Sequence, residues 1–352
     1  MMGGMAGLFY SHAEYLRARY GQTVYRVSVD AGFSCPNRGP DRGRPGCLYC
    51  DSEGARAPYL GPETGLGSEA ERLQSVRRQI EEAARFLRGR YGAESFLLYF
   101  QAFTNTYAPV GELRRLYDAA LEMAPFRELI VSTRPDCIDA AKAQLLASYR
   151  ERGLEVWVEL GLQSACDATL ERIQRGHTVA QFLQAYRLLR ERGIKLAVHL
   201  IFGLPGEGLE EILSTMGFTA GLEPDGVKIH NLHIPSASPL AAEYLAGEIT
   251  APCAPRHLEY VVRALELLSP RTVILRLTCD TPAGRLAAPL GFWPKARFYQ
   301  ALRERMRQEG TRQGRLWPGA SLRSSARLRG ERKRSAAALA GELPRLLEDQ
   351  PV

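Results

Sequence analysis

The chain has 352 residues, of which 45% are hydrophobic and 24% charged, which is typical of a globular protein and excludes a disordered chain. No run of about eighteen apolar residues occurs, which excludes a membrane-spanning helix, and the first residues lack the pattern of a secretory signal. Because there are seven cysteines and no sign of secretion, we expect a cytoplasmic protein with reduced thiols.

The formal net charge of +7 is concentrated near the end of the chain. Between Lys295 and Arg334, thirteen Lys and Arg residues stand against three Glu residues, a balance of +10. Such a region is typical of an arm that binds nucleic acid, and equally typical of a solvated, Arg-rich tail. Charge alone does not choose between these two interpretations.

Short apolar runs alternate with amphipathic segments and predict six strand–helix units before residue 250. The predicted strands are 24–29, 96–100, 128–132, 154–160, 194–202 and 226–232. The predicted helices are 10–21, 68–90 with Ser68 as its N-cap, 110–123, 138–152, 179–192 and 207–220. This order is typical of a parallel sheet with crossover helices, so we predict an α/β fold: a partial (βα)6 barrel resembling the TIM barrel.

Three regions follow from this pattern. We predict that the partial barrel covers residues 10–250 and that a small C-terminal α/β extension covers 251–317. The extension has predicted helices at 254–268 and 295–309, and a predicted strand at 272–278 that could add to the sheet edge. Residues 318–352 are rich in Arg, Ser, Gly and Ala, and we expect a basic, flexible tail there.

Three cysteines, Cys35, Cys47 and Cys50, lie in the loop after the first predicted strand, spaced Cys-x11-Cys-x2-Cys. Glycines let this loop fold back, and nearby arginines favour thiolates. Three thiolates without an obvious fourth ligand indicate a metal centre with one open position. On spacing alone, an iron–sulfur cluster and a zinc site completed by a distant ligand both stay open, while a structural disulfide is disfavoured.

Distinctive motifs occur beyond the cysteine loop, and most of them directly follow a predicted strand. They are Phe100-Gln-Ala-Phe-Thr-Asn-Thr-Tyr107, Ser132-Thr-Arg-Pro-Asp136, Glu159-Leu-Gly-Leu-Gln-Ser164, Arg175-Gly-His177 and His199-Leu-Ile-Phe-Gly-Leu-Pro-Gly-Glu207. Together with the cysteine loop, this ordered set resembles the radical S-adenosylmethionine (SAM) superfamily. It is most similar to the YhcC/YtqA-type subgroup, related to the elongator catalytic subunit and to oxygen-independent coproporphyrinogen oxidase. The wide first gap departs from the superfamily's usual Cys-x3-Cys-x2-Cys and looks like this subgroup's own version.

The resemblance implies that the three cysteines hold a [4Fe–4S] cluster whose fourth iron binds SAM. Reductive cleavage of SAM then gives a radical that takes hydrogen from the substrate, with an electron donor such as flavodoxin or ferredoxin. The implied SAM-binding residues are Tyr49 near the adenine, Gln101, Asn105 and Ser132 after the second and third strands, Arg134 at the SAM carboxylate, Glu159, Gln163 and Arg175 around SAM, and Ile201 and Gly203 in an adenine-binding turn. Several also have an ordinary structural interpretation, such as turn formation for Asn105 or ion pairing for Arg134.

The subgroup looks like one that modifies the wobble uridine of tRNA, converting a 5-carboxymethylaminomethyl group to 5-aminomethyl. We therefore expect tRNA as the substrate, bound in part by the basic C-terminal region. Two alternatives stay open: a radical SAM oxidoreductase acting on a small molecule, and a non-catalytic, zinc-stapled RNA-binding protein. The sequence names no catalytic residue beyond the cofactor sites, and it does not give the oligomeric state.

Overall fold

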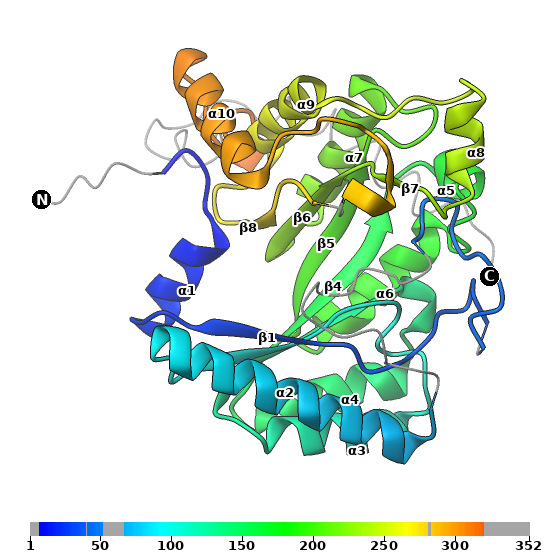
Figure 1. The fold of residues 1–352 in the computed structure, drawn as a ribbon. Coiled ribbons are helices and arrows are strands. Elements are labelled where there is room, and N and C mark those ends of the chain that lie inside the picture. The colour runs from blue at the N-terminus through cyan, green and yellow to red at the C-terminus, as the bar shows by residue number, and fades with distance from the viewer. Residues whose placement is uncertain (1–6, 40, 52–66, 281–282, 320–352) are drawn as a thin grey trace, which may run out of the picture.

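The computed structural model describes residues 7–39, 41–51, 67–280 and 283–319. At its centre a parallel sheet, with the strand order β1-β2-β3-β4-β5-β6-β8, curls into a half-barrel (Figure 1). The strands are β1 (Tyr25–Val29), β2 (Phe96–Phe100), β3 (Phe126–Thr133), β4 (Glu155–Gln163), β5 (Lys195–Phe202), β6 (Gly226–Asn231) and β8 (Val273–Arg276). The predicted α/β partial barrel is confirmed, and the strand expected near 272–278 joins the sheet beside β6.

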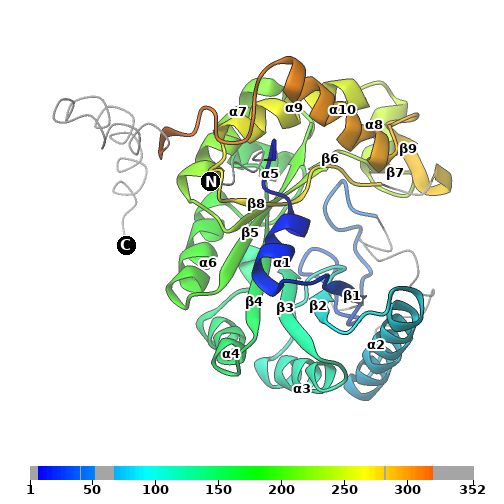
Figure 2. The same cartoon turned by 90° about the vertical axis from the view of Figure 1, so that its left-hand side faces the viewer.

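Helices cover the convex face of this sheet, and in Figure 2 α2, α3, α4, α6 and α7 follow one another around its outside. The longer helices are α1 (His12–Tyr20), α2 (Glu69–Tyr91), α3 (Val110–Leu121), α4 (Ala140–Glu151), α6 (Val179–Glu191), α7 (Leu209–Gly221), α9 (Ala254–Leu267) and α10 (Lys295–Gln308). Ser68 caps α2 as predicted. Its hydroxyl accepts a hydrogen bond from the Glu71 amide, and the Glu71 carboxylate accepts one from the Ser68 amide, which forms a capping box.

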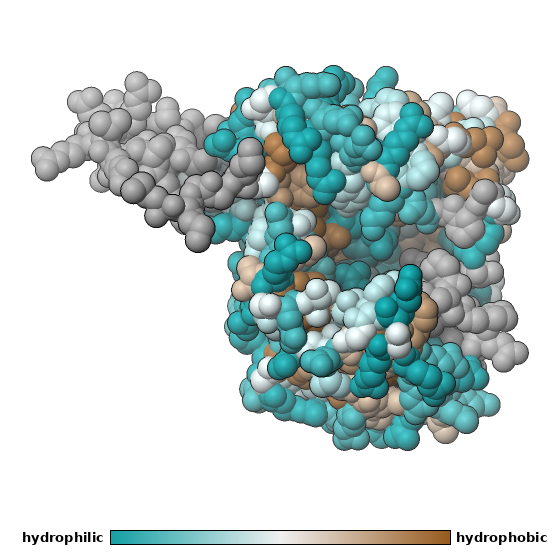
Figure 3. Space-filling view, turned by 60° about the vertical axis from the view of Figure 1, so that its left-hand side comes forward, coloured by the Kyte–Doolittle hydropathy of each residue, from teal (hydrophilic) through white to brown (hydrophobic). Residues whose placement is uncertain are grey.

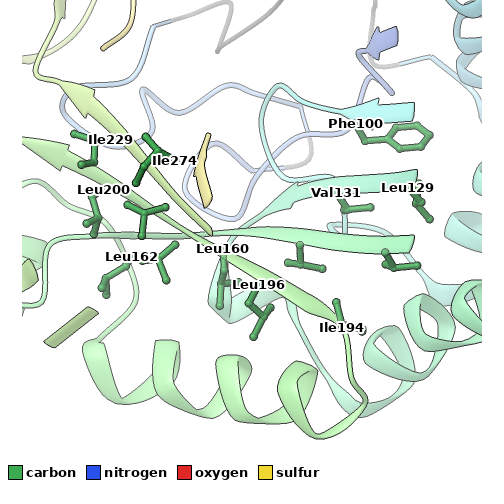
Figure 4. Packing of buried hydrophobic residues seen from close by; sticks show 14 of the residues in the cluster. Phe100, Leu129, Val131, Leu160, Leu162, Ile194, Leu196, Leu200, Ile229 and Ile274 are labelled. Carbon is green, nitrogen blue, oxygen red and sulfur yellow. The ribbon is translucent and has the colours of Figure 1, made fainter. Parts of the chain in front are cut away.

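The main hydrophobic core lies between the sheet and its helices. Alternate strand residues point outward into it, among them the fully buried Leu129, Leu160 and Leu196 (Figure 4). Because side chains alternate along a strand, the intervening residues point into the half-barrel. The concave side can therefore carry polar groups without interrupting the core.

Helix α1 lies at the end of the half-barrel where the strands begin, and the loop after β1 lies at the opposite end (Figure 1). Tyr15 of α1 packs in a second cluster with Leu97, Trp157 and Val273. The chain before α1 also bridges β8, because the amide of Ile274 donates to the Tyr10 carbonyl oxygen at 2.8 Å. The motifs that follow the strands consequently lie at the end opposite α1, as expected for a barrel of this type.

Short elements that the sequence pattern did not predict lie between the long ones. They are α5 (Asp167–Arg172), α8 (Leu240–Leu245), the turns of 3-10 helix η1 (Pro135–Cys137) and η2 (Ala283–Arg285), and the antiparallel strands β7 (Ile234–Pro235) and β9 (Leu286–Ala288). Six residues are too few to show a helical period, and β7 and β9 meet only through the tertiary fold. Strand β4 also runs three residues beyond the predicted end at 160, to Gln163, whose φ is +76°.

The predicted tail at 318–352 lies outside the described residues except for 318 and 319. The proposed boundaries at 250 and 317 stay predictions. Among the helices in the described ranges, none is long and apolar enough to cross a membrane.

Candidate active site

The loop after β1 carries all three candidate metal ligands to the C-terminal end of the half-barrel, where it is drawn in blue in Figure 1. Its beginning is fixed by Gln79 of α2. The Gln79 side chain accepts a hydrogen bond from the Asp30 amide at 2.8 Å and donates one to the Asp30 carbonyl at 2.9 Å. Cys35, Cys47 and Cys50 are all free thiols, so no disulfide competes with metal binding.

Cys47 is surrounded by hydrogen-bond donors. Its sulfur lies 3.2 Å from Nδ2 of Asn37, 3.7 Å from Nη1 of Arg175 and 3.8 Å from Nη1 of Arg134. Burial by itself would raise the pKa of the Cys47 thiol, but the charges of Arg175 and Arg134 outweigh burial and lower it. These charges therefore favour the thiolate of Cys47, the form that binds metals.

Cys50 and Cys35 complete the group. Burial raises the pKa of the Cys50 thiol, the guanidinium of Arg38 opposes this, and negative charge on Cys47 or Cys35 raises it further. The three sulfurs thus act on one another, and a bound cationic centre relieves this repulsion. In the described ranges, no three His, Cys, Asp or Glu side chains already form a group that could hold a metal ion, so the ligand role of the cysteines stays a prediction. Three thiols carried by one loop, with cationic side chains beside Cys47 and Cys50, are the donor chemistry that an iron–sulfur centre requires.

Asn105 ties together the loops that follow β2 and β3. Its amide nitrogen donates to the carbonyl oxygens of Phe100, Ala102 and Ser132, at 3.0–3.1 Å. Its amide oxygen has no hydrogen-bond partner in the described part of the chain. Asn105 therefore holds Gln101 and Ser132 at neighbouring strand ends, which supports a positioning role and leaves one acceptor for a ligand.

Arg134 and Arg175 approach Cys47 from different segments, and both are almost fully buried. Arg134 forms a two-pronged ion pair with Asp136, at 2.9 Å for each contact. Arg175 donates to the Gly161 carbonyl oxygen and to Nε2 of His177, each at 3.0 Å. Arg175 thus holds the cysteine loop against β4.

Glu159 lies inside the half-barrel with a buried polar network of its own. Its Oε2 accepts hydrogen bonds from the Tyr99 hydroxyl and from Nζ of Lys228, each at 2.6 Å, and Lys228 also donates to Tyr99 at 2.7 Å. Burial would raise the pKa of Glu159, but Lys228 and Arg26 outweigh it and lower the pKa to about 2. Glu159 is therefore a paired carboxylate, and its contact with SAM stays a prediction.

The turn after β5 leaves no room for a side chain. Gly203 has a φ of +83°, and a Cβ atom there would lie 2.1 Å from Cγ of Pro252. Ile201 and Tyr49 meet in an apolar cluster beside this turn, together with Leu204. An aromatic ring and an aliphatic side chain beside a glycine turn provide an apolar surface on which a base can pack. Gln163, at the end of β4, is 5% exposed and its amide oxygen has no hydrogen-bond partner among the described residues.

We predict that Gly203→Ala destabilises the protein by about 2 kcal/mol or more, because a left-handed alanine costs about 1–3 kcal/mol and the methyl group also clashes with Pro252. Gly206→Ala is the matched control, since Gly206 has a φ of +87° and nothing within 4 Å of the added Cβ. Urea unfolding of both variants measures the difference. Equal losses of stability would contradict a tightly closed turn.

Comparison with known proteins agrees with this arrangement. The family model described as the radical SAM superfamily matches residues 35–219, and that of the radical SAM C-terminal domain matches residues 224–308. The chain belongs to the radical SAM superfamily. It is 38% identical to protein YhcC of Escherichia coli over 78% of this chain and 84% of YhcC, and 30% identical to protein YtqA of Bacillus subtilis over 86% and 91%.

The chain also matches more distant proteins, one by sequence and one by fold. The radical SAM chain is 29% identical to the tRNA uridine(34) acetyltransferase of Methanocaldococcus jannaschii over 44% of this chain and 28% of that protein. Its fold matches the structure of an archaeal Methanocaldococcus infernus Elp3 lacking its N-terminus, with a TM-score of 0.59 and 19% identity over 82% of this chain and 64% of that one. The protein is thus a radical SAM enzyme of the YhcC/YtqA type, and the family implies SAM and a [4Fe–4S] cluster.

The sequence indicated which loops form the site but missed three of its members. Asn37 lies in the quoted Cys35–Arg38 motif, yet only the structure gives its contact with Cys47. Tyr99 and Lys228 stand in apolar strands, and the one available signal was a lysine between Val227 and Ile229. A charge within a buried strand demands a partner, which the sequence could not name.

Proposed function

We propose that this radical SAM enzyme converts the 5-carboxymethylaminomethyl group of a tRNA wobble uridine to 5-aminomethyl, with its cluster held by Cys35, Cys47 and Cys50. The observation that carries the cluster assignment is the cationic surrounding of Cys47, whose thiol pKa is lowered despite burial. When bound, the cluster and SAM supply a 5′-deoxyadenosyl radical that removes one hydrogen atom from the substrate. Asn37, Arg134 and Arg175 keep the cysteine loop in place and enclose Cys47.

The hydrogen atom leaves the methylene group between the amine nitrogen and the carboxylate, and a carbon radical remains. Loss of one electron, for which a bound iron–sulfur cluster would be the acceptor, and of one proton would give an imine. Addition of water then breaks the C–N bond and yields 5-aminomethyluridine and glyoxylate, so no further oxidant is required. The electron for SAM cleavage would come from a donor such as flavodoxin or ferredoxin.

Two observations support tRNA as the substrate. A relative that shares 29% identity is named as a tRNA uridine(34) acetyltransferase. In addition, helix α10 carries several exposed cations along its length, namely Lys295, Arg297, Arg303, Arg305 and Arg307. Exposed cations of this kind suit contacts with RNA phosphates. We also propose a reducing, cytoplasmic setting, which the seven free thiols support.

The test is substrate-dependent SAM cleavage under anaerobic conditions. We expect 5′-deoxyadenosine and glyoxylate to form in equal amounts when the tRNA carries the carboxymethylaminomethyl group, and neither above background when it carries aminomethyl. Formation of 5′-deoxyadenosine without tRNA, driven by a small molecule such as a porphyrinogen, would contradict the proposal and support the small-molecule alternative. A protein with one bound zinc and no response to SAM would leave only a binding role.

A further inference from the structure

The two edge strands of the half-barrel each present an arginine to its interior. Arg26 lies on β1 and Arg276 on β8, which are the two ends of the sheet. The Arg26 guanidinium lies over the ring of Tyr99, 4.9 Å from its centre, and Nη1 of Arg276 lies 3.2 Å from Nε2 of His230. Both arginine charges act on the pKa of Tyr99 and on that of Lys228, so the two guanidinium groups belong to one polar region.

This region holds more positive than negative charge. Arg26, Arg276 and Lys228 are opposed inside the half-barrel by two buried carboxylates. Lys228 already pairs with Glu159, and burial raises the pKa of Glu128, on which the charge of Arg26 also acts. In the described part of the chain, neither arginine forms an ion pair, since their polar contacts are with ring nitrogens of His12 and His230. Two partly buried guanidinium groups without a carboxylate favour an anionic ligand, because each offers a fork of donors that matches a carboxylate.

Neighbouring groups are consistent with such a ligand. The rings of His199 and His230 meet edge to face with their centres 4.3 Å apart, and burial lowers the pKa of both well below the ordinary value. Nε2 of His199 has no hydrogen-bond partner among the described residues. Lys295 of α10, although exposed, lies within electrostatic reach of the region, because burial and the charges of Arg276 and Arg26 lower its pKa while Asp280 raises it.

The region is reachable from solvent. Figure 3 shows a hollow in the surface, with hydrophilic residues in its floor, between the part of the molecule that carries α10 and the part that carries α2. Strands β1 and β8 are not paired with each other. At the end where the strands begin, α1 and the residues before it lie between them, with Ser11 bridged to Ile274 and His12 beside Arg26.

We propose that Arg26 and Arg276, assisted by Lys228, bind the carboxylate of the substrate's carboxymethyl group and so place its methylene carbon for hydrogen removal. This inference rests on the proposed function and adds the residues that recognise the substrate. The arginines distinguish the substrate from its own product, which lacks the carboxylate. Charge-assisted hydrogen bonds to a buried carboxylate contribute enough for a difference in affinity of about tenfold or more.

The test compares two anticodon stem–loop RNAs that differ only at the wobble uridine, one with carboxymethylaminomethyl and one with aminomethyl. Binding is measured to the SAM-loaded, unreduced holoenzyme, so no turnover is needed. We expect the first RNA to bind about tenfold more tightly or better, and this ratio to fall below about twofold in Arg276→Gln and in Arg26→Gln. Arg276→Lys keeps the charge but not the fork of donors, and we expect an intermediate ratio.

The matched control is Arg297→Gln, an exposed arginine of α10 that stacks on Trp293. We expect it to weaken both RNAs by the same factor and to leave their ratio unchanged. SAM affinity, measured in parallel, should be unchanged in the two glutamine variants.

Four results would overturn the inference: a wild-type ratio near one, a ratio retained in Arg276→Gln and Arg26→Gln, an equal loss for both RNAs in those variants, or a parallel loss of SAM binding. An equal loss would assign the arginines to RNA phosphates, and a loss of SAM binding would assign them to the SAM carboxylate. The proposed function is judged separately, by tRNA-dependent formation of 5′-deoxyadenosine, so either proposal can fail while the other stands.

Discussion

Replacement of Cys47 by alanine is expected to abolish cluster binding and to lower SAM cleavage by more than about a thousandfold, because the radical chemistry belongs to the cofactors and not to the protein. Iron content after anaerobic reconstitution should fall from about four per chain to less than about one. Cys35→Ala and Cys50→Ala should behave in the same way. Iron and acid-labile sulfide analysis measures the effect directly, independently of the substrate.

The chain provides its own control for this experiment. Cys253, at the N-terminus of α9, is exposed, and Cys137, in η1, is a buried thiol within electrostatic reach of Cys35 that we do not expect to bind the cluster. We expect Cys253→Ala and Cys137→Ala to retain full iron content, with at most a modest loss of stability for the buried position. A Cys47→Ala protein that still holds four irons, or a wild-type protein that holds a single zinc, would contradict the assignment.

The second large effect concerns the buried pair of Glu159 and Lys228. Lys228→Met leaves a carboxylate buried without its cation, and we expect a loss of about 3–5 kcal/mol in the free energy of unfolding. Glu159→Leu combined with Lys228→Met removes both charges and should regain most of that loss. Urea unfolding of the two single variants and the double variant measures the coupling between the residues. Additive losses would contradict a tight pair.

The pH dependence follows from the same pair. The pKa of Glu159 is lowered from 4.5 to about 2, so its ionised form stabilises the fold fully above the ordinary value. This contribution is lost as the pH falls from about 4.5 toward 2. The stability difference between the wild type and Glu159→Gln should therefore shrink over this range. A constant difference would mean that Glu159 is not ionised in the folded protein.

Much of the fold followed from the alternation of apolar strands and amphipathic helices, and the motifs at the strand ends named the residues of the candidate site. The partner of Glu159 could not be predicted from the sequence, because it depends on the register of three strands. Glu159 lies beside Ala197 of β5, which lies beside Gly226 of β6. These two small residues leave room for Lys228, two positions along β6, to reach a carboxylate 69 residues away in sequence.

Arg26 and Arg276 likewise could not be brought together from the sequence alone. Arg26 lies in the first strand of the sheet and Arg276 in the last, and only closure of the sheet into a half-barrel turns both toward one interior. Sequence patterns give the direction of each side chain relative to its own strand. They do not show which distant residue faces it, so a substrate site built across the edge strands is invisible before the structure is known.

The most direct test of the central claim is anaerobic reconstitution of the wild-type protein, with electron paramagnetic resonance of the reduced form recorded with and without SAM. We predict about four irons per chain and the spectrum of a reduced [4Fe–4S] cluster that changes when SAM is added, because one iron has no cysteine ligand and is open to SAM. A colourless protein without such a signal, or a cluster whose spectrum does not change when SAM is added, would contradict a [4Fe–4S] cluster that binds SAM.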